Sequence, residues 1–377
     1  MPTQPLQIVG VSLEAPFDPR SWSGSSKFFF DALRSTGALR DAVHVRLPAV
    51  LDRLYQARAV SYPRSRWRAR FNASVPRFTA LTRMAYGRVE RFAPYSAIMQ
   101  IGARIRPNPK VDRPYFGYHD GNAALRYRFF DDGLLTPAQM RSHVAWEASV
   151  YARMQSIFVM SSWLASSFMS DFGIPASRLH VVGAGINFEE LPPLLEKDFD
   201  RPHFLFVGRE FERKGGPILL QAFAEVRRLV PHARLTIVGP PKPAVHGHPG
   251  VEFAGLLSKS VPAELARLQG LFEAATTLVL PSIYEPFGIS LLEGMTYGMP
   301  CVATDRCAMP EIVQDGQTGL IAAAESAPAL AKAMLELASQ PGMAREFGRA
   351  GRRRVEIQFT WNVVADKVVS VVREESP

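Results

Sequence analysis

The sequence predicts an α/β protein with two doubly wound domains, and three observations support this. The chain has 377 residues, more than one hydrophobic core usually supports, so two domains of roughly 150 to 200 residues are expected. Short apolar runs alternate with longer amphipathic stretches, as in a parallel sheet covered by helices. Apolar residues make up 47% of the chain and charged residues 21%, a composition that excludes a disordered protein.

The apolar runs predict two sets of six strands, each bounded by turn residues. The first set is Gln7–Leu13, His44–Leu47, Ala97–Ile101, Pro114–Gly117, Ser156–Ser161 and Leu179–Val182. The second set, which is clearer, is Phe204–Val207, Arg234–Val238, Val251–Phe253, Thr277–Leu280, Cys301–Thr304 and Gly319–Ala322. Between the sets, residues 189–202 contain Leu-Pro-Pro and charged residues without periodicity, which is typical of a linker.

Several other classes are excluded. No run of about 18 uncharged apolar residues is long enough to span a bilayer. The N-terminus lacks a basic stretch followed by an apolar one, so we expect no secretory signal and a cytoplasmic protein. Cys301 and Cys307 are the two cysteines, too few for a disulfide framework or a four-ligand zinc site.

The net charge of +9 is concentrated in one segment. Residues 51–91 hold ten arginines against Asp52 and Glu90 and so account for eight of the nine excess charges. Aromatic residues such as Trp67 and Phe71 are interleaved with these arginines, a mixture that suits an anionic membrane surface, a phosphate-bearing substrate or nucleic acid. The alternative is a solvated helical face with extended arginines. Because the charge is confined to one segment, we expect no nucleic-acid partner.

A turn with two cations follows the strand 204–207. Gly208 would allow close backbone approach to a ligand, and Arg209 with Lys214 would place two positive charges beside a phosphate. Residues 217–230 then form a predicted helix. The alternative is a glycine-containing loop whose charged side chains are solvated.

A second turn, residues 281–288, follows the strand 277–280 and precedes a helix predicted at 289–297. Glu285 lies in the turn and Glu293 about one helical turn inside the helix, where carboxylates can accept hydrogen bonds from sugar or ribose hydroxyls. The free N–H groups of Phe287, Gly288 and Ile289 would attract an anion. The alternative is that the two acids only stabilise the helix N-terminus.

The first half offers weaker candidates. Gly24, in a serine-rich loop after the first strand, would allow close approach to a diphosphate, and a helix is predicted from Lys27 to Leu33. His119 lies at the end of a strand beside polar residues. A lone histidine in such a place is as readily structural as catalytic.

With these motifs assembled, the chain resembles the retaining glycosyltransferases of family four, the glycosyl transferases group 1. Ordered blocks in the second half carry the resemblance: FLFVGREFERKGG, RLTIVGP, VEFAGLLS, LPSIYEPFGISLLEGMTYGMPCVATD and MPEIVQDGQTGLI. The first half resembles the family through the loop at Ser23 and Gly24, His119 and LHVVGAGIN. The first loop departs from the family pattern because Ser23 stands where a second glycine is usual.

The resemblance implies the GT-B fold, two Rossmann-like domains facing a cleft. It places an acceptor-side domain at residues 1–190, completed by a C-terminal helix at about 357–377, and a donor-binding domain at 200–356.

The resemblance also assigns roles to residues, and it implies neither a metal nor another cofactor. Arg209 and Lys214 would bind the diphosphate and stabilise it as the leaving group, and the backbone of Phe287, Gly288 and Ile289 would contact phosphate. Glu285 would contact the donor sugar, and Glu293 would bind the ribose. Gly255 and Leu256 would lie near the base, and His119 would lie near the donor sugar and the acceptor hydroxyl.

The implied function is retaining transfer of a hexose-type sugar from a nucleotide-diphosphate sugar to a hydroxyl acceptor on a glycan, a lipid or a small molecule. Two alternatives stay open: a sugar-nucleotide epimerase or hydrolase on the same fold, and a non-catalytic nucleotide-sugar-binding protein. The acceptor would be lipid-linked or a polysaccharide, and residues 53–91 would contact the inner face of an anionic membrane.

Overall fold

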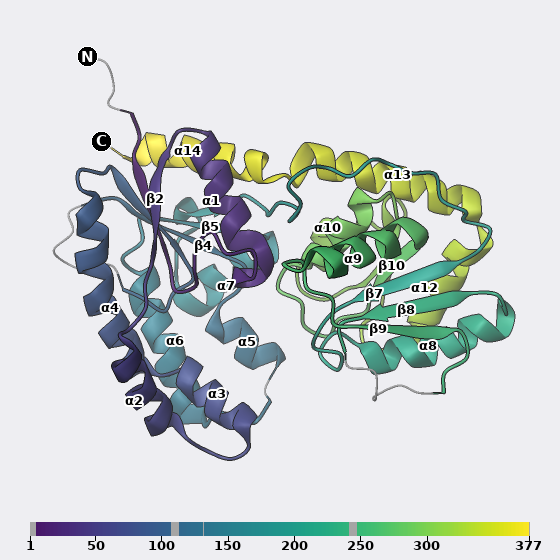
Figure 1. Ribbon diagram of the computed structural model, residues 1–377, viewed down its shortest axis with the longest axis horizontal. Helices are drawn as coiled ribbons and strands as arrows, with labels where there is room; N and C mark the ends of the chain where they lie inside the picture. Colours follow the sequence, from purple (N-terminus) through teal and green to yellow (C-terminus); the bar gives the residue numbers. More distant parts are fainter. Residues whose placement is uncertain (1–4, 107–112, 131, 241–246, 377) are drawn as a thin grey trace. The chain divides into compact units, whose positions relative to one another are not determined.

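A computed structural model of the chain describes residues 5–106, 113–130, 132–240 and 247–376 (Figure 1). The chain divides into two compact units. Unit 1 comprises residues 1–183 and 361–377, and unit 2 comprises residues 184–360. From the sequence we expected the first boundary at residues 190–200 and the return to the first domain near residue 357.

Unit 1 contains a six-stranded parallel sheet in the order β2-β1-β3-β4-β5-β6. Its strands are β1 (Ile8–Ser12), β2 (Leu39–His44), β3 (Ala97–Ile101), β4 (Tyr115–His119), β5 (Ser156–Val159) and β6 (Leu179–Val181). Its helices are α1 (Ser25–Ser35), α2 (Ala49–Ala59), α3 (Arg64–Asn72), α4 (Val75–Val89), α5 (Ala123–Phe129), α6 (Pro137–Tyr151), α7 (Ser162–Phe172) and α14 (Trp361–Glu375).

Unit 2 has a second six-stranded parallel sheet, in the order β12-β11-β10-β7-β8-β9. Its strands are β7 (His203–Val207), β8 (Arg234–Val238), β9 (Val251–Gly255), β10 (Thr277–Leu280), β11 (Cys301–Thr304) and β12 (Gly319–Ala322). Its helices are α8 (Gly216–Leu229), α9 (Pro262–Ala274), α10 (Ile289–Thr296), α11 (Met309–Ile312), α12 (Ala327–Ser339) and α13 (Pro341–Gln358).

The strands follow from burial on both faces of each sheet. All residues of β5, β10 and β11 are buried, so these strands are continuous apolar runs in the sequence. The predicted bounds of β3, β8, β10, β11 and β12 are confirmed to the residue.

One predicted strand, His44–Leu47, is wrong. The strand is β2 at Leu39–His44, which lies at the edge of the sheet beside β1. An edge strand tolerates polar residues, and β2 includes Arg40 and Asp41, so its apolar signal is weak. The apolar Val45 and Leu47 that suggested a strand are buried but follow the strand's end.

The predicted linker, residues 189–202, is attached to unit 2. Lys197 is buried, and its Nζ donates hydrogen bonds to the carbonyl oxygens of Phe272, Glu273 and Ala275 at the end of α9. Burial lowers the pKa of Lys197 to about 8. A lysine bound to the last carbonyls of a helix is a favourable cap.

In both sheets, the side on which successive strands are added reverses at an internal strand. In unit 2 the chain adds β8 and β9 on one side of β7 and then returns to place β10 on its other side. In unit 1 the same reversal falls between β1 and β3. In open α/β sheets, ligands bind at the carboxyl ends of the strands at such a reversal.

No helix in the described part of the chain is long and apolar enough to cross a membrane.

Candidate functional site

The turns after β7 and β10 meet at the reversal point of unit 2. Since these strands are paired in parallel, their carboxyl ends lie side by side. The Nζ of Lys214, from the first turn, lies 2.9 Å from the Oε2 of Glu285, from the second. Both side chains are largely buried. The structure thus brings together one predicted cation and one predicted carboxylate.

Gly215 permits this close approach. It has φ of +73°, and a Cβ there would lie less than 3.0 Å from the carbonyl oxygen of Pro281. Two hydrogen bonds join the turns: the backbone N–H of Ile283 donates to the carbonyl of Arg213 over 3.0 Å, and the Arg213 guanidinium donates to the carbonyl of Tyr284. Only glycine satisfies both the conformation and the space at position 215.

Glu285 is held as a carboxylate in this site. Burial by itself raises the pKa of Glu285, but the positive charges of Lys214 and Arg213 outweigh burial, so its pKa lies below the ordinary value. The Arg213 guanidinium is 3.9 Å from the Glu285 carboxylate. Sequence analysis missed Arg213, although it directly precedes Lys214 in the same basic turn.

Arg209 is placed differently from Lys214. Its side chain is exposed and makes no ion pair with any residue that the structure describes. Gly208, which precedes it, directly follows β7, and its N–H donates to the carbonyl of Val238 on β8 over 2.9 Å. The carboxyl ends of β7 and β8 therefore lie side by side, and the exposed Arg209 side chain can turn toward a ligand bound there.

The N-terminus of α10 faces the same turn. The helix begins at Ile289, after Gly288, and Phe287 is buried against Phe359. The Oγ of Ser290, a residue only 9% exposed, has no hydrogen-bond partner among the described residues. A helix N-terminus with an additional unused hydroxyl is a suitable site for an anion.

Glu293 is buried within α10 and forms an ion pair with Lys259, from the segment after β9. The Lys259 ammonium also lies 5.2 Å from the centre of the Phe188 ring. Lys259 was not predicted, because nothing in the local sequence marks it as the partner of a distant helix. Gly255 ends β9, and Leu256 beside it is exposed. Both therefore lie where the strands of this parallel sheet have their carboxyl ends.

In unit 1 the loop after β1 has an unusual backbone. Trp22, Ser23 and Gly24 have φ of +47°, +58° and +96°, so Ser23 occupies a conformation that glycine favours. The Trp22 indole N–H donates to the Asp120 carboxylate over 2.9 Å. This contact joins the loop to the end of β4, and sequence analysis missed Asp120.

His119 does not reach that loop. Its ring is buried, with an edge contact to Tyr151 at 5.2 Å and a tilted contact to Phe168 at 5.6 Å between ring centres. Its Nε2 has no hydrogen-bond partner among the described residues, and burial lowers its pKa to about 3. Asp120, the residue after β4, makes the contact with that loop instead. His119 is therefore buried in unit 1, and its expected place near the donor sugar and acceptor hydroxyl stays a prediction.

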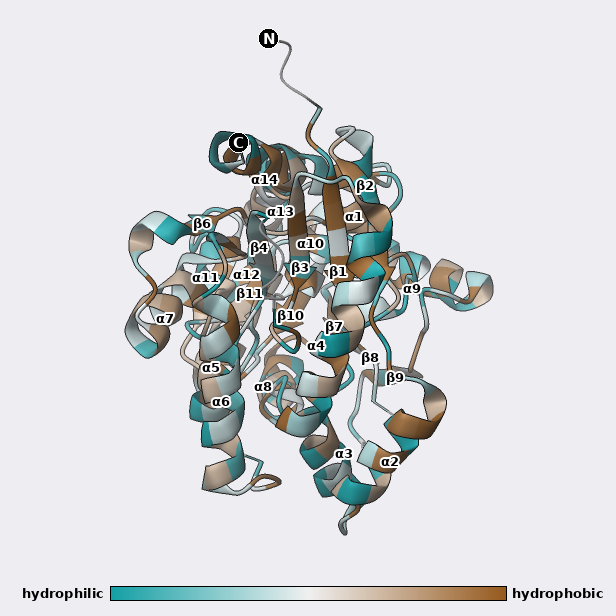
Figure 2. Cartoon of the chain, turned by 90° about the vertical axis from the view of Figure 1, so that its left-hand side faces the viewer, coloured by the Kyte–Doolittle hydropathy of each residue, from teal (hydrophilic) through white to brown (hydrophobic). Residues whose placement is uncertain are grey.

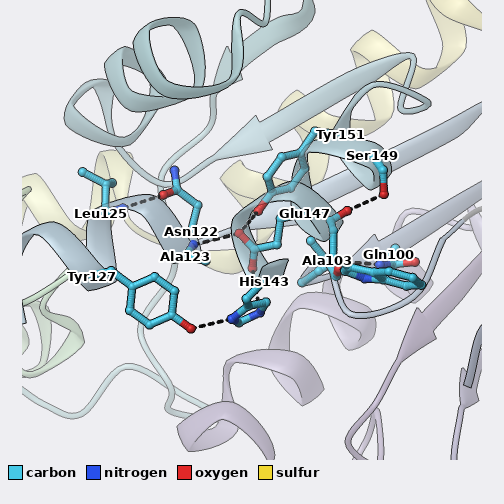
Figure 3. Close-up of polar contacts among 12 residues, drawn as sticks. Gln100, Ala103, Asn122, Ala123, Leu125, Tyr127, His143, Glu147, Ser149 and Tyr151 are labelled. Carbon is cyan, nitrogen blue, oxygen red and sulfur yellow. Dashed lines mark hydrogen bonds and ion pairs between the residues drawn. The ribbon is translucent and has the colours of Figure 1, made fainter. Parts of the chain in front are cut away.

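A buried polar network holds the segment after β4 (Figure 3). The Glu147 Oε2 accepts hydrogen bonds from the backbone N–H of Ala123 over 2.8 Å and from the Tyr151 hydroxyl over 3.0 Å. Its Oε1 is 3.6 Å from the Nε2 of His143, whose Nδ1 bonds the Tyr127 hydroxyl over 2.6 Å. Glu147 therefore anchors the start of α5 and, through it, the position of the Asp120 loop.

Replacing Glu147 by glutamine should make unit 1 relatively more stable as the pH rises from about 5 to 8. Burial raises the pKa of Glu147 to about 7, so the folded state holds this proton more tightly than the unfolded state does. The contribution of Glu147 to stability is therefore fully present below its unfolded pKa and is lost as the pH rises through 7. Glutamine can accept the same two hydrogen bonds and does not titrate. The difference in unfolding free energy between Glu147→Gln and wild type should change by about 1 to 3 kcal/mol over this pH range.

Tryptophan fluorescence during urea unfolding can follow unit 1 alone, because all five tryptophans lie in it. His119 is present in both proteins, so its opposite pH dependence cancels. Glu374→Gln, at an exposed position of α14 in unit 1, controls for the loss of one carboxylate. A pH-independent difference between wild type and Glu147→Gln would refute the burial argument.

Comparisons with known proteins found similar sequences and structures. Residues 201–340 match the family model described as glycosyl transferases group 1. The chain is 28% identical over 261 residues to the alpha-maltose-1-phosphate synthase of Mycolicibacterium smegmatis, covering 61% of this chain and 66% of that protein. It is 29% identical over 240 residues to the GDP-mannose-dependent alpha-(1-6)-phosphatidylinositol monomannoside mannosyltransferase of Mycobacterium tuberculosis, covering 57% and 60%. The chain thus spans just under two thirds of these curated relatives.

Among solved structures, the sucrose-phosphate synthase from Thermosynechococcus elongatus is similar over 98% of this chain and 99% of its own. The TM-score is 0.72 and the sequence identity 18%. At this identity the likeness concerns the fold, which is the two-domain α/β fold of GT-B type.

Proposed function

We propose, for a chain that belongs to the glycosyl transferases group 1 family through residues 201–340, that it transfers a sugar from a nucleotide-diphosphate sugar to a hydroxyl acceptor. The observation that carries this proposal is the Lys214–Glu285 pair at the reversal point between β7 and β10. It places a cation for phosphate and a carboxylate for hydroxyls within hydrogen-bond distance of each other, beside a helix N-terminus.

In the proposed reaction, negative charge develops on the diphosphate as the glycosidic C–O bond breaks. Lys214, Arg209 and the first N–H groups of α10 would stabilise that charge more in the transition state than in the ground state. Because these groups supply positive charge, the proposal includes no metal or other cofactor.

The two carboxylates would bind different parts of the donor. Glu285 accepts hydrogen bonds from hydroxyls of a hexose-type sugar, while Lys214 turns from the carboxylate toward the phosphates. Glu293 accepts from the ribose diol, and Lys259 moves aside or bridges to the nucleotide. Gly255 and Leu256 would lie near the base.

We further propose that the anomeric configuration is retained. No protein nucleophile is assigned, so the acceptor would attack from the face that the diphosphate leaves, through an oxocarbenium-like ion pair. His119, which is buried and neutral, keeps its proposed place near the donor sugar and the acceptor hydroxyl. The loop at Gly24, joined to Asp120 through Trp22, is the part of unit 1 assigned to the substrates.

The acceptor is proposed as a hydroxyl of a glycan, a lipid or a small molecule. One relative is named for a phosphatidylinositol monomannoside, which favours testing lipid-linked acceptors first. Contact of residues 53–91 with an anionic membrane fits such an acceptor, and a cytoplasmic location stays a prediction.

The two glutamates should differ in calorimetric titrations. Glu293→Gln should weaken binding of both the free nucleoside diphosphate and the nucleotide sugar, since both contain the ribose. Glu285→Gln should weaken mainly the nucleotide sugar, because the free diphosphate lacks the sugar hydroxyls. We expect a loss of about tenfold in each affected affinity, corresponding to one lost charged hydrogen bond. Equal losses for the bare diphosphate in both variants would contradict this division.

Nucleotide release from UDP-, GDP-, ADP- and dTDP-sugars, with and without candidate acceptors, tests the function itself. Acceptor-dependent release supports a transferase. Release without an acceptor identifies a hydrolase, conversion of the sugar without release identifies an epimerase, and binding without turnover identifies a binding protein.

A further inference from the structure

Helices α2 and α3 expose an apolar ridge. Val50 and Leu54 lie one helical turn apart on α2 and are 70% and 56% exposed, while Val60 and Tyr62, in the connection to α3, are 62% and 91% exposed. Ala59 is the one fully buried residue of α2, and α3 has none. The outward face of a surface helix is ordinarily polar, so these exposed apolar side chains are unusual. Figure 2 shows apolar and hydrophilic residues alternating along both helices.

Arginines surround this ridge. Residues 49–72 contain six arginines and a single acid, Asp52, and five of the arginines are exposed: Arg53, Arg58, Arg64, Arg66 and Arg68. Asp52 is already paired with Arg77 of α4 at 3.0 Å. The exposed guanidinium groups therefore have no carboxylate within the two helices left to neutralise them.

The aromatic residues expected from the sequence to enter a membrane have another role. The Trp67 indole N–H donates to the carbonyl of Gln56 over 2.7 Å and so joins α3 to α2. The Phe71 ring is covered by the Arg77 guanidinium at 4.2 Å. These two side chains hold the helices together, and the exposed apolar positions are those of the ridge.

We propose that α2 and α3 dock on an anionic lipid bilayer, with Val50, Leu54, Val60 and Tyr62 entering the interface and the arginines contacting lipid phosphates. An exposed apolar ridge bordered by unpaired cations is complementary to a surface that is apolar beneath a layer of negative charge. Attraction between these charges acts only within a Debye length of about 8 to 10 Å, so binding is salt-sensitive. The membrane contact stands apart from catalysis, and only the use of a membrane-bound acceptor rests on the proposed function.

Co-sedimentation of the full chain with vesicles tests this proposal. We expect the protein to pellet with vesicles containing phosphatidylglycerol at low salt, to be released at high salt, and to stay in solution with phosphatidylcholine alone. The triple variant Arg64→Gln, Arg66→Gln and Arg68→Gln should bind at least about tenfold more weakly. A matched variant, Arg201→Gln, Arg228→Gln and Arg349→Gln, loses the same charge from unit 2 and should bind like wild type.

The ridge is tested separately. Leu54→Ser with Val60→Ser should also weaken binding about tenfold, because apolar burial is lost while the charge is unchanged. In Tyr62→Trp, brominated lipids should quench fluorescence more than in wild type. Tryptophan fluorescence also verifies that each variant keeps unit 1 folded.

Several results would overturn the proposal: no pelleting with anionic vesicles at low salt, equal loss in both triple arginine variants, or equal retention on duplex DNA. The last result identifies a nucleic-acid surface. Turnover of a soluble acceptor by a protein that fails to bind vesicles refutes the membrane contact and leaves the proposed function standing. Vesicle binding by a protein that shows no turnover supports the membrane contact and refutes the proposed function.

Discussion

Replacing Lys214 by alanine should lower kcat/KM for sugar transfer by about 100-fold or more, because the charge that develops on the departing diphosphate loses a preorganised partner. Lys214 comes from the turn after β7, and its ammonium lies 2.9 Å from Glu285 at the meeting point of two strand ends. It is thus held in place before any ligand binds, against the turn that precedes α10.

The fold should survive this substitution. Glu285 keeps the Arg213 guanidinium at 3.9 Å and the Ser282 hydroxyl at 3.5 Å as partners, so its carboxylate is not left as an unpaired buried charge. Lys332→Ala, at an exposed position of α12, controls for the loss of a lysine and should retain wild-type rates. Initial rates of nucleotide release measure the effect. Near-normal turnover in Lys214→Ala, with a thermal transition like that of wild type, would remove Lys214 from the mechanism.

Replacing Gly215 by alanine should destabilise unit 2 by roughly 2 to 5 kcal/mol, combining the cost of a left-handed conformation with that of overpacking. The new Cβ would lie against the backbone carbonyl of Pro281 rather than a flexible side chain. The only relief is movement of the two turns apart. That movement would separate Lys214 from Glu285, so turnover should fall together with stability.

Gly270→Ala is the matched control for this substitution. Gly270 lies within α9, and a Cβ there would meet nothing within 4 Å. Alanine in a helix interior should leave stability unchanged or raise it by about 0.5 to 1 kcal/mol. Unit 2 has no tryptophan, so thermal unfolding is followed by far-ultraviolet circular dichroism, which reports on both units, with tryptophan fluorescence identifying the transition of unit 1. If both alanine variants unfold at the same temperature, the turns are not held together as described.

The sequence alone determined the fold class and most of the strands. Strands such as β8, β10 and β11 are buried between layers of helices, and such burial requires a local apolar run that can be recognised without knowing its neighbours. The turns that bear Lys214 and Glu285 were likewise predictable, because each directly follows a recognisable strand and precedes a helix.

Only the tertiary structure decided which side chains meet. Strand order places β10 beside β7, and local sequence does not encode that order, so the partners Arg213 and Lys259 were missed. Burial of His119 depends on Tyr151 and Phe168 from helices that follow it in the chain. Likewise, the exposure of Val50, Leu54, Val60 and Tyr62 depends on how little of α2 and α3 packs against the rest of unit 1. Residue type and spacing determine secondary structure locally, whereas ion pairs, burial and exposed surfaces arise from contacts between segments distant in the chain.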